Sequence, residues 1–154
     1  MSNLCRGCNY CIVSFGNFLS HFLLLAMRLF WGYSFFQGGL GKLQNIKPVI
    51  KFLESLDIPW PEFSAYLIGG VECIGGLMLL VGLASRFVSI PLAVIMIVAI
   101  FTAHYEALEG ILDNPQRFIN QLPFNYLLTC LVVLSFGPGV FSLDYLIGRK
   151  CNAE

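Results

Sequence analysis

The sequence predicts an all-α integral membrane protein: a bundle of four transmembrane helices, with a short amphipathic helix between the first and the second. Of the 154 residues, 57% are hydrophobic and 12% are charged, whereas soluble domains carry about 25% charged residues. A domain of this size has too little interior to bury so much apolar surface. Four stretches are long enough to cross a hydrocarbon core about 30 Å thick, and none shows the period-two alternation of a barrel strand.

The four predicted spans are residues 16–37, 63–84, 87–103 and 122–141. His21 and Arg28 interrupt the first span, and Glu72 is the one charge in the second. The first span is too long for the apolar region of a signal peptide, so we expect it to be retained. Ser85 and Arg86 alone link the second and third spans, which must therefore be antiparallel neighbours.

The predicted amphipathic helix covers residues 47–56, in the long connection after the first span. Its apolar side chains recur at helical spacing on one face: Val49, Phe52, Leu53 and Leu56. Such a helix is expected to lie in the membrane interface. Trp60, just beyond it, is a residue type that anchors at headgroup level.

The predicted organisation is a single membrane domain, residues 16–148, between a cysteine-containing cytoplasmic tail (residues 1–15) and a short C-terminal tail (residues 149–154). Four crossings place both termini on one side, for which we expect the cytoplasm. Nine basic and nine acidic residues give zero formal net charge, without a basic run. Nucleic-acid binding, which requires clustered cations, is therefore excluded.

Arg28 and Glu72 are predicted to form an intramembrane charge pair. A charge at the bilayer centre costs about 2.5–3.5 kcal/mol on the insertion scale, and an opposite charge would offset that cost. Counted from Gly38 and Phe63, both residues lie about 13–15 Å deep. Each charge shares a helix face with glycines, which allow another helix to come close, so we expect two glycine-containing stripes to meet. Two interpretations stay open: a lock that fixes helix register, or a site for a proton or a quinol. His21, His104 and Lys42 are further candidates for a polar pocket.

The cysteine spacing Cys5-x2-Cys8-x2-Cys11 superficially resembles the start of an iron–sulfur motif, and Cys151 falls on the same side of the membrane. A metal site on these four thiols is the weakest of three interpretations. Acylation is the second, and thiols tolerated in a reducing compartment are the first. We therefore expect no metal.

Three ordered motifs resemble one family. They are Arg28-x3-Gly32-x2-Phe35-x3-Gly39-x2-Lys42, then Glu72-x2-Gly75-Gly76 leading to Ser85-Arg86, and finally Gly137-Pro138-Gly139-x2-Ser142-Leu143-Asp144. In this order and spacing, over roughly residues 25–148, the chain is similar to DoxX, a family of small bacterial four-helix proteins of the inner membrane. The resemblance marks Arg28, Lys42, Glu72, Arg86 and Asp144 as patterned polar residues, without implying a catalytic role for them.

The exit of the last span has a local physical account. Gly-Pro-Gly ends the helix, and Ser142 can cap a short helix that starts at Leu143. Asp144 is then available to pair with Arg86, which lies on the same side of the membrane. We expect that pair to be a structural clamp.

The resemblance implies an accessory or anchor subunit of a quinone-linked or thiol and oxidative-stress redox system. The cofactor is left open; a quinone is the candidate, with Trp31, Phe35 and Tyr66 as residues to line its pocket. The partners would be the lipid bilayer, a redox enzyme and, in a homo-oligomer, further copies of the chain. Two alternatives are a small transporter or channel and a membrane thiol-oxidoreductase that uses the N-terminal cysteines. Whether the chain is itself an enzyme is left open.

Overall fold

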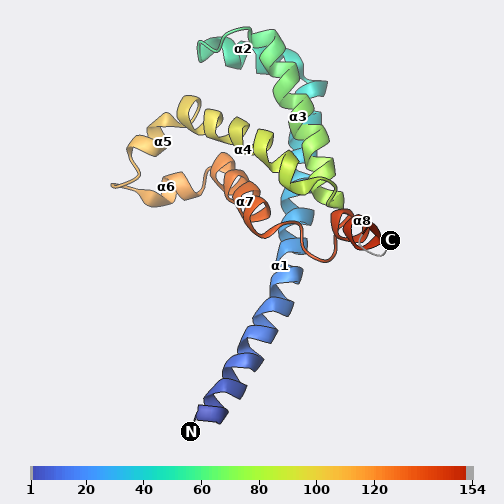
Figure 1. Cartoon of the computed structure of the whole chain (residues 1–154). Coiled ribbons are helices and arrows are strands. Elements are labelled where there is room, and N and C mark those ends of the chain that lie inside the picture. The colour runs from blue at the N-terminus through green and yellow to red at the C-terminus, as the bar shows by residue number, and fades with distance from the viewer. Residues whose placement is uncertain (1, 152–154) are drawn as a thin grey trace.

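The structure is a computed structural model that describes the backbone of residues 2–151 and the side chains of residues 13–149. Every regular element in residues 2–151 is a helix (Figure 1). The helices are α1 (Ser2–Gln44), α2 (Ile46–Ser55), α3 (Pro61–Val81), α4 (Ser85–Thr102), α5 (Tyr105–Glu109), α6 (Pro115–Ile119), α7 (Leu122–Phe136) and α8 (Leu143–Cys151).

Three of these helices are long and apolar enough to cross a membrane: α1 over Val13–Gln44, α3 and α4. Helix α7 is apolar but has 15 residues, a length of about 22 Å. The protein is thus a helical membrane protein with three long apolar helices and a shorter fourth. The short amphipathic helix predicted after the first span is present as α2.

Two predicted boundaries are wrong. Helix α1 starts at Ser2 and runs on to Gln44, beyond both ends of the predicted 16–37. Near its C-terminal end, Gly39 packs against the backbone of α3 instead of breaking the helix. The second and third spans turn at residues 82–84 and not at Ser85–Arg86, which begin α4. Gly82 ends α3 because its φ of +78° is favourable only for glycine.

Helices α1 and α3 pack closely and antiparallel through glycines on both sides. A Cβ atom added to Gly39 would lie 2.7 Å from the carbonyl oxygen of Gly69, and one added to Gly76 would lie 2.8 Å from that of Gly32. Backbones come this close only where small residues form both surfaces. The predicted meeting of two glycine-containing stripes is therefore confirmed.

Helix α4 packs mainly on α7, which gives a second helix pair. The two pairs join through a buried cluster that we call the central core: Phe35, Leu79, Leu92, Ala93, Met96, Cys130 and Val133. From the turn at residues 82–84, α3 and α4 diverge towards α2 and α5 (Figure 1). We call the end with this turn and α8 the closed end, and the end with α2, α5 and α6 the open end.

Candidate functional site

Glu72 forms an ion pair with Lys42, through its Oε2 atom and the lysine Nζ. The Glu72 side chain is 3% exposed and the Lys42 side chain 36%. The packing of α1 on α3 explains the pair: Gly32 faces Leu80 and Gly39 faces Cys73, so the residue level with Glu72 is Leu40, two positions before Lys42. Both charges therefore lie at the same depth.

The predicted pair between Arg28 and Glu72 is wrong. Arg28 precedes Leu40 by twelve positions in one straight helix, which separates it from the level of Glu72 by about 18 Å. The prediction placed both residues at one depth because it ended the first helix at Gly38. Since α1 continues to Gln44, Arg28 lies level with the turn at the closed end and Lys42 takes its place beside Glu72.

The Arg28 guanidinium is instead bound by backbone carbonyl groups. Its Nε donates to the carbonyl of Leu79 at 3.1 Å, Nη2 donates to that of Leu80 at 3.4 Å, and Nη1 donates to those of Pro138 and Phe141. The residue is 1% exposed. Arg28 therefore satisfies the last carbonyls of α3 and holds the segment that follows α7 against them.

The ion pair lies in the wall of an apolar cavity of about 310 Å³, which we call the main cavity. Helix α2 covers it with Val49, Phe52, Leu53 and Leu56, the apolar face that the sequence indicates. Its other walls come from α3 and α4, including Ser64, Leu67, Ile68, Val94, Ile95, Val98, Ala99, Thr102 and Ala103. Lys42 and Glu72 are the charged residues of this lining, so the main cavity combines hydrocarbon walls with one polar end.

A second cavity, of about 290 Å³, lies at the open end and has polar walls. We call it the outer chamber. His104, Tyr105, Glu106, Arg117 and Gln121 line it, and Arg117 Nη2 lies 3.3 Å from Glu106 Oε2. Leu56, Thr102 and Ala103 belong to the walls of both cavities. The predicted polar residues Lys42 and His104 therefore lie in neighbouring cavities.

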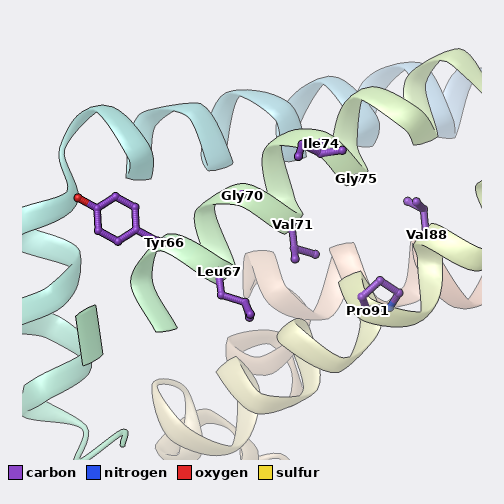
Figure 2. Close-up of a pocket in the computed structure, with 8 residues that line it drawn as sticks. All are labelled: Tyr66, Leu67, Gly70, Val71, Ile74, Gly75, Val88 and Pro91. Carbon is purple, nitrogen blue, oxygen red and sulfur yellow. The ribbon is translucent and has the colours of Figure 1, made fainter. Parts of the chain in front are cut away.

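The three aromatic residues expected around a quinone do not line the main cavity. Phe35 stacks on Tyr126 with ring centroids 4.1 Å apart, and Trp31 meets the same ring edge-on at 5.3 Å. Tyr66 lines a separate apolar groove of about 420 Å³ between α3 and α4. Figure 2 shows that groove, with Val88 and Pro91 from α4 facing residues of α3. The aromatic residue that lines the main cavity is Phe52.

The remaining predicted residues lie away from the two cavities. His21 is near Gly139 at the closed end, where its Nδ1 is buried without a hydrogen-bond partner among the described residues. Cys5, Cys8, Cys11 and Cys151 have side chains outside the described part of the structure, so the metal and thiol interpretations stay predictions.

Asp144 acts as a clamp, but not through Arg86. Its carboxylate accepts the amide protons of Ala84 and Ser85, at 2.7 and 2.9 Å. It thus caps the start of α4 from α8. Arg86 lies beside Gly137, and the ion pairs of the described side chains do not include it. The predicted cap at Ser142 is confirmed, because its hydroxyl accepts the amide proton of Tyr145 at 3.1 Å.

The Lys42–Glu72 pair has unused hydrogen-bonding capacity. The lysine ammonium has three protons, and the carboxylate offers a second oxygen, Oε1, for which the described residues supply no donor. A ligand in the main cavity can therefore accept a hydrogen bond from Lys42 and donate one to Glu72. The surrounding apolar walls lower the local dielectric constant, which strengthens both interactions.

Comparison with known proteins gives the same family as the motifs. The DoxX family model matches residues 23–105, just over half of the chain. CatD of Bacillus subtilis (strain 168), provisionally named an oxidoreductase, is 36% identical over 130 residues, which cover 82% of this chain and 89% of that protein.

The inner membrane protein YqjF of Escherichia coli (strain K12) is 26% identical over 127 residues, covering 82% of this chain and 93% of that protein. An uncharacterised membrane protein of Mycobacterium tuberculosis (strain ATCC 25618 / H37Rv) is 28% identical over 144 residues, covering 84% of each chain. No solved structure matches. With more than half of its length matched by the family model and 36% identity to one relative, this chain belongs to the DoxX family.

Proposed function

We propose that this protein is an accessory or anchor subunit of a quinone-linked or thiol redox system, and that its main cavity binds a quinone-type ring. One observation carries the proposal: an ion pair with a buried carboxylate, Lys42–Glu72, lies at the polar end of an apolar cavity within the membrane domain. Ionisable groups inside a membrane are costly, and they commonly mark substrate or proton sites.

The chemistry of the pair suits both forms of such a ring. A quinone carbonyl accepts a hydrogen bond from the Lys42 ammonium, and a quinol hydroxyl donates one to the second oxygen of Glu72, Oε1. Val94 and Val98, in the cavity wall, are 54% and 46% exposed. The gap between α3 and α4 therefore opens towards lipid, and the apolar tail of a membrane quinone can leave through it.

The relatives support a redox system and the inner membrane, since one is provisionally named an oxidoreductase and another is named an inner membrane protein. We propose the same membrane for this chain, with four crossings and both termini in the cytoplasm. In that topology α7 and the Gly-Pro-Gly segment after it form the fourth crossing. A soluble redox enzyme, or a second copy of the chain, would then dock on the bundle.

The transporter alternative is less well supported. A path from the main cavity to the closed end would have to cross the central core, where Leu79, Leu92 and Val133 have no exposed surface. The thiol-oxidoreductase alternative predicts that serine at Cys5, Cys8 and Cys11 abolishes activity. In the quinone proposal the same substitutions leave quinone affinity unchanged.

The test is a titration of the purified protein in nanodiscs with ubiquinone and with menaquinone. We expect saturable binding that is lost in Glu72→Gln and in Lys42→Met. The matched control is Glu106→Gln, which removes a carboxylate from the exposed pair with Arg117 and should bind as the unmodified protein does. Absence of saturable binding in the unmodified protein would refute the proposal.

A further inference from the structure

The main cavity extends lengthwise from the Lys42–Glu72 pair to the surface of the open end. Glu72 follows the first residue of α3 by eleven positions, which puts it about 16 Å below that surface. The lining also includes Leu56 and Ile58, which flank the end of α2, and Thr102 and Ala103, which end α4. One continuous space therefore joins a group deep in the membrane domain to the open end.

At that surface the main cavity meets the outer chamber. The shared wall consists of Leu56, Thr102 and Ala103, small or medium-sized side chains that are each partly exposed. Beyond them, the chamber presents His104, Glu106 and Arg117 to solvent. With about 290 Å³ and polar walls, this chamber can hold water that hydrogen-bonds to its side chains.

The closed end lacks such an opening in the described structure. Below Glu72, α1 and α3 are in backbone contact at Gly32 and Gly76, and the central core fills the space towards α4 and α7. Arg28 then joins the end of α3 to the segment that follows α7. A proton at Glu72 would have to cross close-packed apolar side chains to leave in this direction.

We propose that Glu72 exchanges protons with water on one side only: the open end, through the main cavity and the outer chamber. The lateral gap between α3 and α4, at Val94 and Val98, faces lipid, which excludes ions but admits an apolar molecule such as a quinone. The apolar molecule would thus reach Glu72 through the lateral gap, and the proton would reach it from the open end. This inference concerns the site of the proposed function, but it holds or fails independently of quinone binding.

The groups that face Glu72 fit this role. Lys42, on α1, is the ion-pair partner of the carboxylate. Tyr126, on α7, is close enough for its hydroxyl to interact electrostatically with Glu72. Helices α2 and α4 add no charged residue to the lining, only the hydroxyl of Thr102 at the mouth. His104, Tyr105, Glu106 and Arg117 follow in the outer chamber.

The test uses carbodiimides on sealed vesicles that contain the full chain, sorted by orientation through a tag at the C-terminus. A carbodiimide reacts with a protonated carboxyl: the acid proton moves to a reagent nitrogen as the carboxyl oxygen bonds to the reagent carbon. The Lys42 amine then attacks the activated carboxyl. Glu72 and Lys42 thereby form an amide bond and lose the elements of one water molecule. The carbodiimide gains those elements and is released as a urea.

A membrane-impermeant quaternary-ammonium carbodiimide should modify Glu72 only in vesicles that have the open end outward. Peptide mass spectra would detect the modification either as a reagent adduct on Glu72 or as a cross-link between Glu72 and Lys42. Glu106, whose side chain is 87% exposed, reports in the same spectra that the open end was reached. Lipid-soluble dicyclohexylcarbodiimide should modify Glu72 in both orientations. Modification by the impermeant reagent from the closed end, or by the lipid-soluble reagent alone, would overturn the proposal.

A variant at the mouth tests the route itself. Ala103→Trp, and independently Leu56→Trp, should reduce modification by the impermeant reagent to the background of Glu72→Gln. Dicyclohexylcarbodiimide should still modify Glu72 in both variants. This retained reaction also shows that the site has folded. Phe101→Trp is the matched control, because Phe101 is 60% exposed on the same helix and outside both linings. Unchanged modification in both mouth variants would contradict this route.

Discussion

Arg28 and Glu72 are both buried charges of the membrane domain, and their surroundings differ. Arg28, at the closed end, has its guanidinium taken up by carbonyls of α3 and of the segment after α7. Glu72, towards the open end, is paired with Lys42 and borders a cavity. The two buried charges therefore have different roles: Arg28 joins backbone segments, whereas Glu72 remains available to a ligand.

The two ends of the bundle differ in packing in the same way. At the closed end, glycine contacts, the central core and the Asp144 cap leave little free volume. At the open end α3 and α4 diverge (Figure 1), and apolar side chains of α2 line the cavity between them. A tightly packed closed end holds the helices that carry Lys42 and Glu72 in a fixed position relative to each other.

The largest effect is expected for Arg28→Gln. The shorter amide cannot reach carbonyls on two segments, and buried carbonyls without donors each cost roughly 1 kcal/mol or more. We expect a loss of about 4 kcal/mol in the free energy of unfolding in detergent micelles. A loss no larger than that of Glu72→Gln would contradict the distinction between the two charges.

Gly76→Ala should follow, with a loss of about 3 kcal/mol, because overpacking at a backbone contact forces α1 and α3 apart. The new Cβ would lie 2.8 Å from the carbonyl oxygen of Gly32. Gly70→Ala, in the same helix, meets nothing within 4 Å and should leave stability unchanged or raise it. Equal losses in both variants would show that helix propensity, rather than the close contact, is being measured.

Asp144→Ala should lower the free energy of unfolding by about 2 kcal/mol, since two amides at the start of α4 lose their acceptor. Asp144→Asn keeps one acceptor oxygen and should lose less. Arg86→Gln serves as a comparison: if it destabilises as much as Asp144→Ala, the originally predicted ion pair contributes after all.

Glu72→Gln should change the free energy of unfolding by less than about 1 kcal/mol, because the amide keeps its hydrogen-bonding capacity and Lys42 remains partly solvated. Quinone affinity should be lost in the same protein. A destabilisation similar to that of Arg28→Gln would make Lys42–Glu72 a structural lock.

Glu106→Gln should have the smallest effect, about 0.5 kcal/mol or less, since both side chains of its ion pair are mostly exposed. Thermal unfolding with and without added salt checks this value. A larger loss would mean that the outer chamber contributes to the fold, and it would remove this variant as a control.

Much of the architecture could be predicted from the sequence. The order of the apolar helices, the amphipathic helix α2 and the glycine stripes follow from composition and periodicity, which act locally along the chain. Helix ends were less predictable. Glycine is a poor helix former, so the local sequence predicts that α1 ends near Gly38, Gly39 and Gly41. The helix continues because Gly39 packs against α3, and this tertiary contact is not visible in the local sequence.

That one boundary decided which residue pairs with Glu72. With the helix ended at Gly38, Arg28 and Glu72 share a depth; with the helix extended to Gln44, Lys42 does. Lys42 follows Gly39 by three positions and therefore shares its face, which is the signal that would have placed it correctly. The main cavity depends on how far α3 and α4 diverge, and no local pattern encodes that angle.

The most direct test of the distinction between the two charges is the change in Tm caused by quinone, measured in nanodiscs for the unmodified protein and for Glu72→Gln. A ligand that binds the folded state raises Tm with its concentration. We predict that Tm rises in the unmodified protein, whereas Glu72→Gln starts at nearly the same Tm and shows no rise. An unmodified protein that does not respond to quinone, with a Glu72→Gln variant of much lower Tm, would contradict the account.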